Sequence, residues 1–311
     1  MRYLQRFAFP AALATLVSYG LVALPQFRTV ATMRNILAFS AILFIVALGQ
    51  TIVVISRGVD LSVGSMAGLA GAVFAKVVDN GWSLGIGPPF LGTLTALGMA
   101  VLIGAGFHGL LITKARISFL IVTLGTFAIL RSQVNVVLQG RSVTVGIDAF
   151  DRFVNGRILG IPNVVLIAAV VYVGVVLLLR STVFGRALYA VGANPAAARI
   201  AGIPVDRVVM TAYGLSAFLA AVGGILIVGQ LGSAQVTAGS GMELTAIAAV
   251  LLGGTRFSGG YGSATHTLMG VLFLGVLNGV LTLAGVSSFW QGTASGLVLI
   301  AAVTIDRTRE V

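Results

Sequence analysis

Cysteine is absent from the 311 residues of this chain, and charged residues are scarce at 9%. Without cysteine the chain can form no disulfide, no zinc–thiolate site and no thiol nucleophile. Soluble domains carry about a quarter of charged residues, so this scarcity excludes an ordinary soluble domain. Acidic residues number only eight against 19 basic ones. The basic residues stand singly at the ends of apolar runs, which is typical of membrane topology, and we expect no nucleic-acid partner.

Apolar residues make up 58% of the chain, and its mean hydropathy is +1.07. A helix needs about 20 mostly apolar residues to cross the hydrocarbon core of a bilayer. Ten segments qualify, near 8–26, 36–56, 61–79, 90–112, 117–138, 164–180, 208–230, 241–255, 266–285 and 288–305. The third and eighth are short or rich in glycine and serine, so we expect them to be broken or buried within the bundle. The sequence predicts an all-α integral membrane protein, with one transmembrane domain over 1–311.

The distribution of basic residues predicts the orientation. Arg2 and Arg6 precede the first apolar run, which is either an uncleaved span or a signal peptide; no convincing small-x-small cleavage site follows it. An uncleaved first span with a cytoplasmic N-terminus leaves twelve basic residues inside, Arg2, Arg6, Arg57, Lys114, Arg116, Arg180, Arg186, Arg199, Arg207, Arg256, Arg307 and Arg309. Six lie outside, Arg28, Arg34, Lys76, Arg141, Arg152 and Arg157, and Arg131 falls within the fifth span. This excess predicts that both termini are cytoplasmic.

Two loops stand out under this topology. The segment 181–207 is predicted to be cytoplasmic. The longest outer loop, 139–163, carries Asp148 and Asp151. It is either a contact surface for an external partner or a solvated connector.

The cytoplasmic loop contains a short helix with well-defined ends. Asn194 is a good N-cap, and Pro195 falls at the first helical position, where its missing N–H costs nothing. Helix-compatible residues continue the segment: Ala196, Ala197, Ala198, Arg199, Ile200 and Ala201. Gly202 suits a left-handed closing position, and Pro204 prevents the helix from resuming. The sequence therefore predicts a rigid, capped helix at the membrane surface.

No constellation typical of an enzyme is present in the sequence. The only histidines, His108 and His266, lack carboxylate or thiol neighbours at metal-ligand spacing. No GxxxxGK[ST] motif is present to cradle phosphates. We therefore expect no catalytic residue, no metal and no ATP site in this chain.

Polar residues inside apolar runs are costly and therefore informative. Asp60 either pairs with Arg57 or caps the third span, where the helix dipole favours negative charge, and capping is the preferred interpretation. Glu243 could cap the eighth span in the same way. The amides of Gln50, Asn135, Asn278 and Gln291 lie within apolar runs. They either bond neighbouring helices or, together with Glu243, line a polar substrate path.

Small residues spaced as GxxxG occur at Gly64 and Gly68 and again at Gly275 and Gly279. This spacing favours close packing of membrane helices.

Three stretches together resemble the ribose-type sugar permeases of bacterial ABC importers. "RGVDLSVGSMAGL", which includes Asp60, Ser62, Gly64 and Ser65, is similar to the GGIDLSVGS segment of that family. "GRALYAVGANPAAARIAGIPVDRV" resembles the cytoplasmic loop that docks on the ATPase. "GSAQVTAGSGMELTAIAAVLLGGTRFSGGYGS", which includes Gly253 and Gly254, is similar to the family signature AxxxAGxGxELDAIAAVVLGGTSLAGGxG. The resemblance runs in matching order from about Ile36 to Asp306. Arg57 stands where the family usually has glycine, and Thr245 where it often has aspartate.

The resemblance implies a role for each loop and a set of partners. Asn194–Gly202 would be the coupling helix, which sits in a groove of a separate ATPase subunit, and Arg199 and Arg207 could meet acidic groups there. That ATPase would bind the ATP and magnesium, and a periplasmic sugar-binding protein would deliver the substrate. A second copy of the permease, or a homologous one, would complete the translocation path in the lipid of the bacterial inner membrane.

Other interpretations remain open from the sequence. One is a secondary transporter driven by an ion gradient, although no lysine or histidine is well placed to partner Asp60 or Glu243. Another is an ABC importer of a nucleoside, a signalling furanone or a polyol. A passive channel would not need the capped helix. The helix itself could instead lie on lipid headgroups, but its small apolar face, mainly alanines and Ile200, would bind lipid weakly.

Overall fold

A computed structural model describes residues 2–79, 87–287, 290–294, 296–297 and 300. In this part of the chain, six helical segments are long and apolar enough to cross a bilayer. They are α2 (Val30–Ile55), the continuous run of α4 (Pro88–Val101), η2 (Leu102–His108) and α5 (Gly109–Thr113), α6 (Phe119–Leu138), α8 (Asn163–Ser181), α11 (Val205–Leu231) and α13 (Ala264–Leu283). The chain is thus an all-α membrane protein, as the sequence predicts.

Three of the remaining predicted spans form other helices. α1 (Arg2–Ala23) contains the apolar stretch Ala11–Ala23, and α3 (Val63–Asp79) has 17 residues. α12 (Met242–Leu252) has 11 residues and so rises about 16 Å, roughly half the thickness of the hydrocarbon core. The third and eighth segments are therefore short, as expected. The tenth, 288–305, and the C-terminus lie largely outside the described residues.

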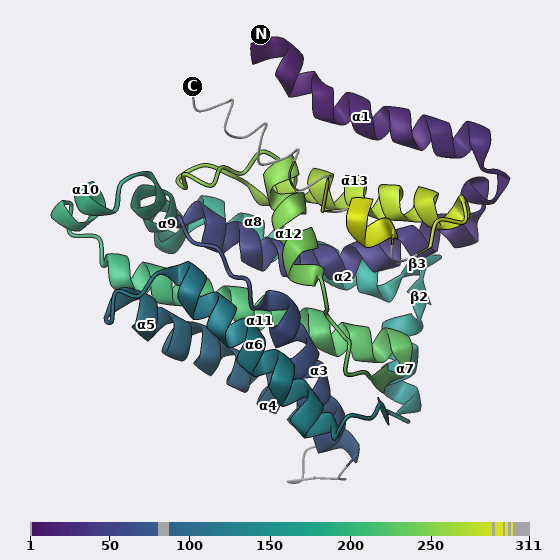
Figure 1. Cartoon of the computed structure of the whole chain (residues 1–311), viewed down its shortest axis with the longest axis horizontal. Helices are drawn as coiled ribbons and strands as arrows, with labels where there is room; N and C mark the ends of the chain where they lie inside the picture. The colour runs from purple at the N-terminus through teal and green to yellow at the C-terminus, as the bar shows by residue number, and fades with distance from the viewer. Residues whose placement is uncertain (1, 80–86, 288–289, 295, 298–299, 301–311) are drawn as a thin grey trace.

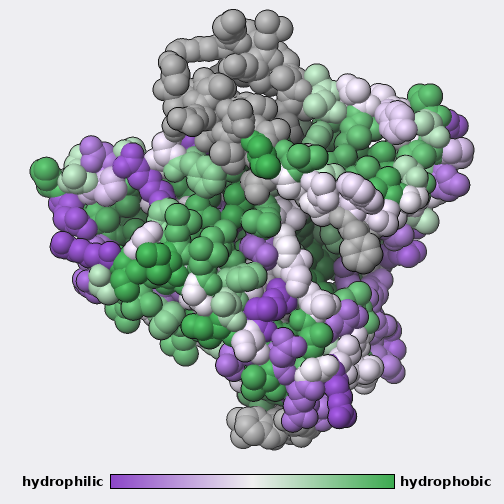
Figure 2. Space-filling view, viewed as in Figure 1, coloured by the Kyte–Doolittle hydropathy of each residue, from purple (hydrophilic) through white to green (hydrophobic). Residues whose placement is uncertain are grey.

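The long helices run between two differently built ends of the molecule (Figure 1). One end, here called the α10 end, carries α9 (Val183–Ala193) and α10 (Pro195–Ile200). The other, here called the hairpin end, carries α7 (Asp148–Asn155) and the hairpin of β2 (Arg157–Ile158) and β3 (Ile161–Pro162). Figure 2 shows hydrophilic residues gathered at both ends and a mostly hydrophobic surface between them, as expected for a bundle in a bilayer.

Two smaller elements complete the hairpin end. A 3-10 turn, η1 (Pro25–Arg28), joins α1 to α2. An antiparallel pair of two-residue strands, β1 (Val143–Thr144) and β4 (Ser233–Ala234), ties the loop after α6 to the end of α11.

Helices α2 and α11 form the centre of the bundle. In their most apolar windows, 89% and 78% of the residues are buried, against 22–33% in the other four spanning segments. Glycine permits this close packing: a Cβ at Gly224 of α11 would meet the backbone oxygen of Ala67 in α3. The other spanning segments therefore pack around this buried central pair.

The two GxxxG motifs differ in what they pack against. In α13, Gly275 and Gly279 lie against Ser40 and Ile36 of α2, which confirms the predicted close packing of helices. In α3, a Cβ at Gly64 would meet the carboxylate of Glu243 and the carbonyl of Gly239. There the small residues admit an irregular loop and a carboxylate in place of a helix.

Candidate functional site

The helix α10 is built as its sequence predicts. The side-chain Oδ1 of Asn194 accepts from the backbone N–H groups of Ala196 and Ala197, both at 3.0 Å. Pro195 occupies the first helical position, and Gly202 closes the segment with a φ of +79°. The capped helix is thus confirmed as a local structure, and its docking role stays a prediction.

Exposure separates the residues of α10 into two faces. Ile200 is 90% exposed, and Ala197 is also exposed. Ala198 is only 4% exposed and packs into the main hydrophobic core. Of the two predicted coupling residues Ala197 and Ala198, Ala197 lies on the exposed face and Ala198 faces the core, and their role in coupling stays a prediction.

The charges around α10 are paired within the chain. Asp206, in the first turn of α11, accepts from Nη2 of Arg199 at 3.1 Å and from Nζ of Lys114 at 2.8 Å. The Arg199 side chain remains 65% exposed despite this ion pair, and Arg207 is exposed, so contact of either residue with an acidic partner stays a prediction. Beside these ion pairs lies an open cavity of about 410 Å³ lined by Arg199, Ile203 and the residues that follow to Arg207.

Asp60 is fully buried in the turn between α2 and α3. Its Oδ1 accepts from the backbone N–H of Ser62 at 2.9 Å and from the Ser62 hydroxyl at 2.6 Å. Its Oδ2 accepts from the hydroxyl of Ser216 in α11 at 3.1 Å. Asp60 thus fixes the turn that leads into α3, but it bonds Ser62, the residue before the helix, so its capping of α3 stays a prediction. Among the described residues it forms no ion pair with Arg57.

The backbone conformation at Arg57 explains why the family usually has glycine at this position. Arg57 has a φ of +70°, a left-handed conformation in which glycine is strained least. Its Nε donates to the backbone oxygen of Ser258 at 2.6 Å. The cation therefore points away from Asp60 and ties the α2–α3 turn to the loop between α12 and α13.

Gln50 serves the same turn. With its amide oriented so that each atom faces its complement, Gln50 donates to the backbone oxygen of Asp60 at 3.1 Å and accepts from its N–H at 3.2 Å. Gln50 is fully buried. It bonds a neighbouring segment, the structural one of its two predicted roles.

A second polar cluster lies where α3, α6 and α12 meet. Oε1 of Glu243 accepts from the N–H of Gly241 at 3.2 Å, which supports the predicted capping of α12. Nη1 of Arg131 in α6 donates to the backbone oxygen of Ala238 at 2.9 Å. Within this cluster, Glu243 Oε2 and Arg131 Nη2 have no hydrogen-bond partner among the described residues, and the same holds for the buried hydroxyl of Ser65 in α3. We refer to Arg131 and Glu243 as the unsatisfied cluster.

The other predicted path residues lie at two separate locations in the bundle. Asn135 lies on the exposed face of α6, next to Ser132 and Gln133. Asn278 and Gln291 instead line a cavity of about 300 Å³ between α2 and α13. The structure therefore does not bring the predicted path residues together in one channel.

The backbone conformation and packing after α12 explain why Gly253 and Gly254 are glycines. A Cβ at Gly253 would meet the backbone oxygen of His266, and Gly254 has a φ of +92°. Both positions belong to the close approach of α12 to α13.

The sequence analysis predicts no functional role for Arg131 or His108. His108 ends the π-helix η2, is fully buried, and meets the ring of Tyr213 edge-on with centroids 5.9 Å apart. Neither ring nitrogen of His108 has a hydrogen-bond partner within the described residues, so the structure shows no bond between His108 and Asp60. π-Helical turns often mark functional sites, but this one gives no recognisable signal in a single sequence.

Comparison with known proteins identifies the family. Residues 32–303 match the permease component of branched-chain amino acid transport systems. The chain belongs to this permease family.

Its relatives within the permease family have annotated transport roles. The ribose import permease protein of Escherichia coli K12 is 39% identical over 306 residues, covering 96% of this chain and 92% of the relative. The ribose import permease protein of Bacillus subtilis 168 is 39% identical over 294 residues, covering 92% and 87%. The autoinducer 2 import system permease protein of Enterobacter sp. strain 638 is 36% identical over 299 residues, covering 95% and 85%. No solved structure matches the chain significantly.

Proposed function

We propose that this chain is the transmembrane permease subunit of an ATP-driven, binding-protein-dependent importer of a ribose-like sugar. The observation that carries the proposal is α10, a rigid capped helix that presents Ile200, 90% exposed, at one end of the bundle. Relatives that import ribose, similar over nearly the whole chain, supply the substrate class. The permease performs no covalent chemistry itself, and a separate ATPase binds the ATP and magnesium.

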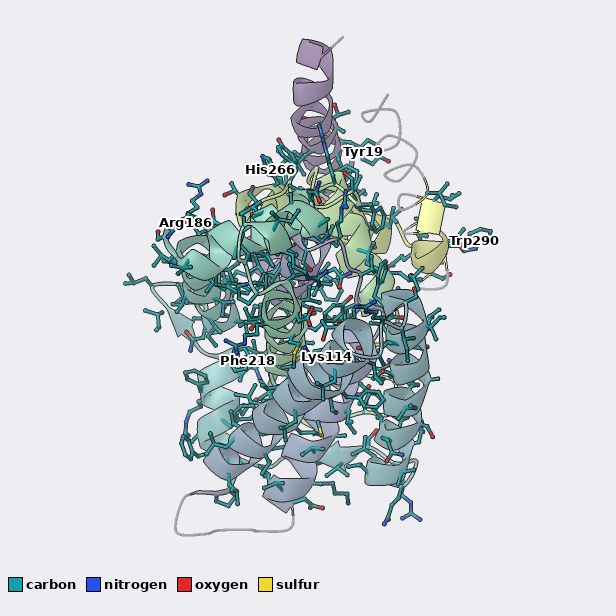
Figure 3. The ribbon with its side chains drawn as sticks, turned by 90° about the vertical axis from the view of Figure 1, so that its left-hand side faces the viewer. Tyr19, Lys114, Arg186, Phe218, His266 and Trp290 are labelled. Carbon is teal, nitrogen blue, oxygen red and sulfur yellow. The ribbon has the colours of Figure 1, made fainter. Side chains whose placement is uncertain are left out.

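The proposed topology has ten membrane segments, some of them short, and both termini in the cytoplasm of a bacterium. The single domain 1–311 then exposes 181–207 to the cytoplasm and 139–163 to the periplasm. Basic residues at the α10 end support this orientation through the positive-inside rule. Figure 3 looks onto that end, where Arg186 projects away from the ribbon.

The exposed polar face of α6 supports a second permease copy, or a homologous permease, as partner. Ser132, Gln133 and Asn135 are exposed on a helix long enough to span the bilayer. Lipid tails offer these groups no hydrogen bonds, so such residues face water or protein. We place the sugar path between the two copies along this face, beside the unsatisfied cluster of Arg131 and Glu243. The remaining outer surface contacts membrane lipid.

The hairpin end is the proposed docking surface for a periplasmic sugar-binding protein. Leu159, at the tip of the β2–β3 hairpin, is 97% exposed, and Phe153 on α7 is 58% exposed. Asp148 and Asp151 lie in the first turn of α7 beside them. An apolar tip flanked by acids suits a protein partner better than bulk water.

Each of two alternative functions is supported by one observation. Relatives that import autoinducer 2 favour a non-sugar such as a furanone, and nucleosides or polyols belong to the same alternative. The complete burial of Asp60 and His108 favours an ion-gradient-driven transporter, because such proteins use buried titratable groups.

The test is uptake of labelled ribose by vesicles that contain the chain with its native ATPase and binding protein. The proposal predicts uptake that requires ATP and persists when the proton gradient is collapsed. Uptake that needs the gradient and ignores ATP would favour the secondary transporter. ATP-dependent uptake of autoinducer 2 in preference to ribose would keep the importer and change the substrate.

A further inference from the structure

Three segments far apart in the sequence meet next to α10. They are the end of α9, the end of α2 and the loop 253–263 between α12 and α13. The backbone N–H of Gly260 donates to the oxygen of Ile55 at 2.9 Å. A Cβ at Gly192 of α9 would meet that same oxygen and, at 2.5 Å, the nitrogen of Gly260. We call Ile55, Gly192, Gly259 and Gly260 the glycine junction.

Close backbone approach makes the glycine junction intolerant of side chains. Gly259 and Gly260 have φ angles of +78° and +68°, and a Cβ at Gly260 would lie 2.7 Å from Cα of Ala193. Gly192 is buried inside a helix, so an added methyl group there would act by steric contact alone. Interfaces packed this closely transmit displacement, because they have no free volume to absorb it.

Two side chains tie the same three segments together. The hydroxyl of Tyr189 in α9 donates to the backbone oxygen of Gly262 at 2.8 Å. Nε of Arg57 donates to the oxygen of Ser258 at 2.6 Å. The loop 253–263 is thus bonded to α9 on one side and to the α2–α3 turn on the other.

The glycine junction lies between α10 and the polar interior. On one side, α9 ends at Ala193, directly before Asn194, the N-cap of α10. On the other side, the α2–α3 turn leads through Asp60 into α3, and the loop 253–263 leads back to α12. α12 carries Glu243, a member of the unsatisfied cluster, and α3 packs against its carboxylate at Gly64. A contiguous series of packed and bonded groups therefore joins the exposed helix to the path.

We propose that the glycine junction transmits movement of the docked α10 to α3 and α12, with Gly192 and Tyr189 as its positioning residues. The inference rests on the proposed function, since it assumes an ATPase at α10. When the ATPase moves α10, α9, the loop 253–263 and the α2–α3 turn move as one body. Rigid-body movement of this kind is how packed bundles alternate between states.

Spin labels test the rigid body directly, because the chain contains no native cysteine. Arg186→Cys on α9 and Ser258→Cys in the loop place labels on two exposed side chains. In the purified complex with its ATPase, we expect the distance between the labels to be the same with and without ATP. In Gly192→Ala, we expect it to shift or broaden when ATP is added. A shift in the parent complex, or a fixed distance in both, would overturn the proposal.

Coupling gives the second readout, as labelled ribose imported per ATP hydrolysed. Gly192→Ala should keep ATP hydrolysis and lose most uptake, and Tyr189→Phe should lower the ratio several-fold. The matched control is Gly174→Ala in α8, where a Cβ would meet nothing within 4 Å. Wild-type ratios in both test variants would refute the junction, and if Gly192→Ala fails to assemble, Tyr189→Phe decides alone. A parent complex that lacks an ATPase refutes the proposed function instead.

Discussion

Replacing Ile200 with glutamate should detach the ATPase without unfolding the permease. Ile200 is 90% exposed, so nearly its whole side chain is available for burial by a partner. Burying an isoleucine side chain stabilises a complex by about 1.5–3 kcal/mol. Because 1.4 kcal/mol corresponds to a tenfold change, the lost burial alone predicts roughly ten- to hundredfold weaker binding. Desolvation of the new carboxylate would weaken binding further.

The assay is the amount of ATPase that co-purifies with the tagged permease, with thermal unfolding measured on the same samples. Exposed substitutions usually change stability by less than about 0.5 kcal/mol, so the melting temperature should hold. Leu159→Glu is the matched control, since Leu159 is 97% exposed at the opposite end. It should retain the ATPase and lose binding-protein-dependent uptake. Full ATPase recovery with Ile200→Glu would refute docking at α10.

Three further substitutions test the packing. Gly224→Ala should lower stability by about 1–3 kcal/mol, because its methyl group would overlap the backbone of α3, whereas Gly174→Ala should not; thermal unfolding in detergent compares the two. Asp60→Ala should lower the free energy of unfolding by about 3 kcal/mol in the same assay, because hydrogen bonds to a charged group contribute about 1.5–3 kcal/mol each. An unchanged melting temperature would contradict the hydrogen bonding described for this turn. Ala198→Glu should reduce the yield of folded permease, because it buries a charge in the core, and normal yield would mean that Ala198 is accessible.

Local signals predicted α10 well. Asn194, Pro195 and Gly202 determine the ends of a helix through groups at most three residues away, so a single sequence contains the whole argument. The long spans were predicted for a similar reason, because apolar length alone suffices for them. The fold class therefore follows from composition and pattern.

Tertiary partners explain what the sequence missed. Ser216, which bonds Asp60, lies 156 residues further along the chain, and no spacing rule connects the two. Gln50 and Asn278 were grouped as path candidates because both are amides in apolar runs. One instead holds a buried turn, and the other lines a separate cavity. Polar type indicates that such a residue has a partner, but only the packing of the helices shows which one.

The left-handed Arg57 is an intermediate case. Its departure from the family's glycine was visible in the sequence, but the reason was not. A φ of +70° explains the usual glycine, and the bond to Ser258 explains how an arginine is accommodated.

The most direct test of the central claim is to purify the tagged chain from its own membranes in mild detergent and identify its companions by mass spectrometry. The account predicts a stoichiometric ATP-binding protein, together with a second permease copy or a homologue. Recovery of the chain alone in several detergents, with transport abolished by collapse of the proton gradient, would contradict it.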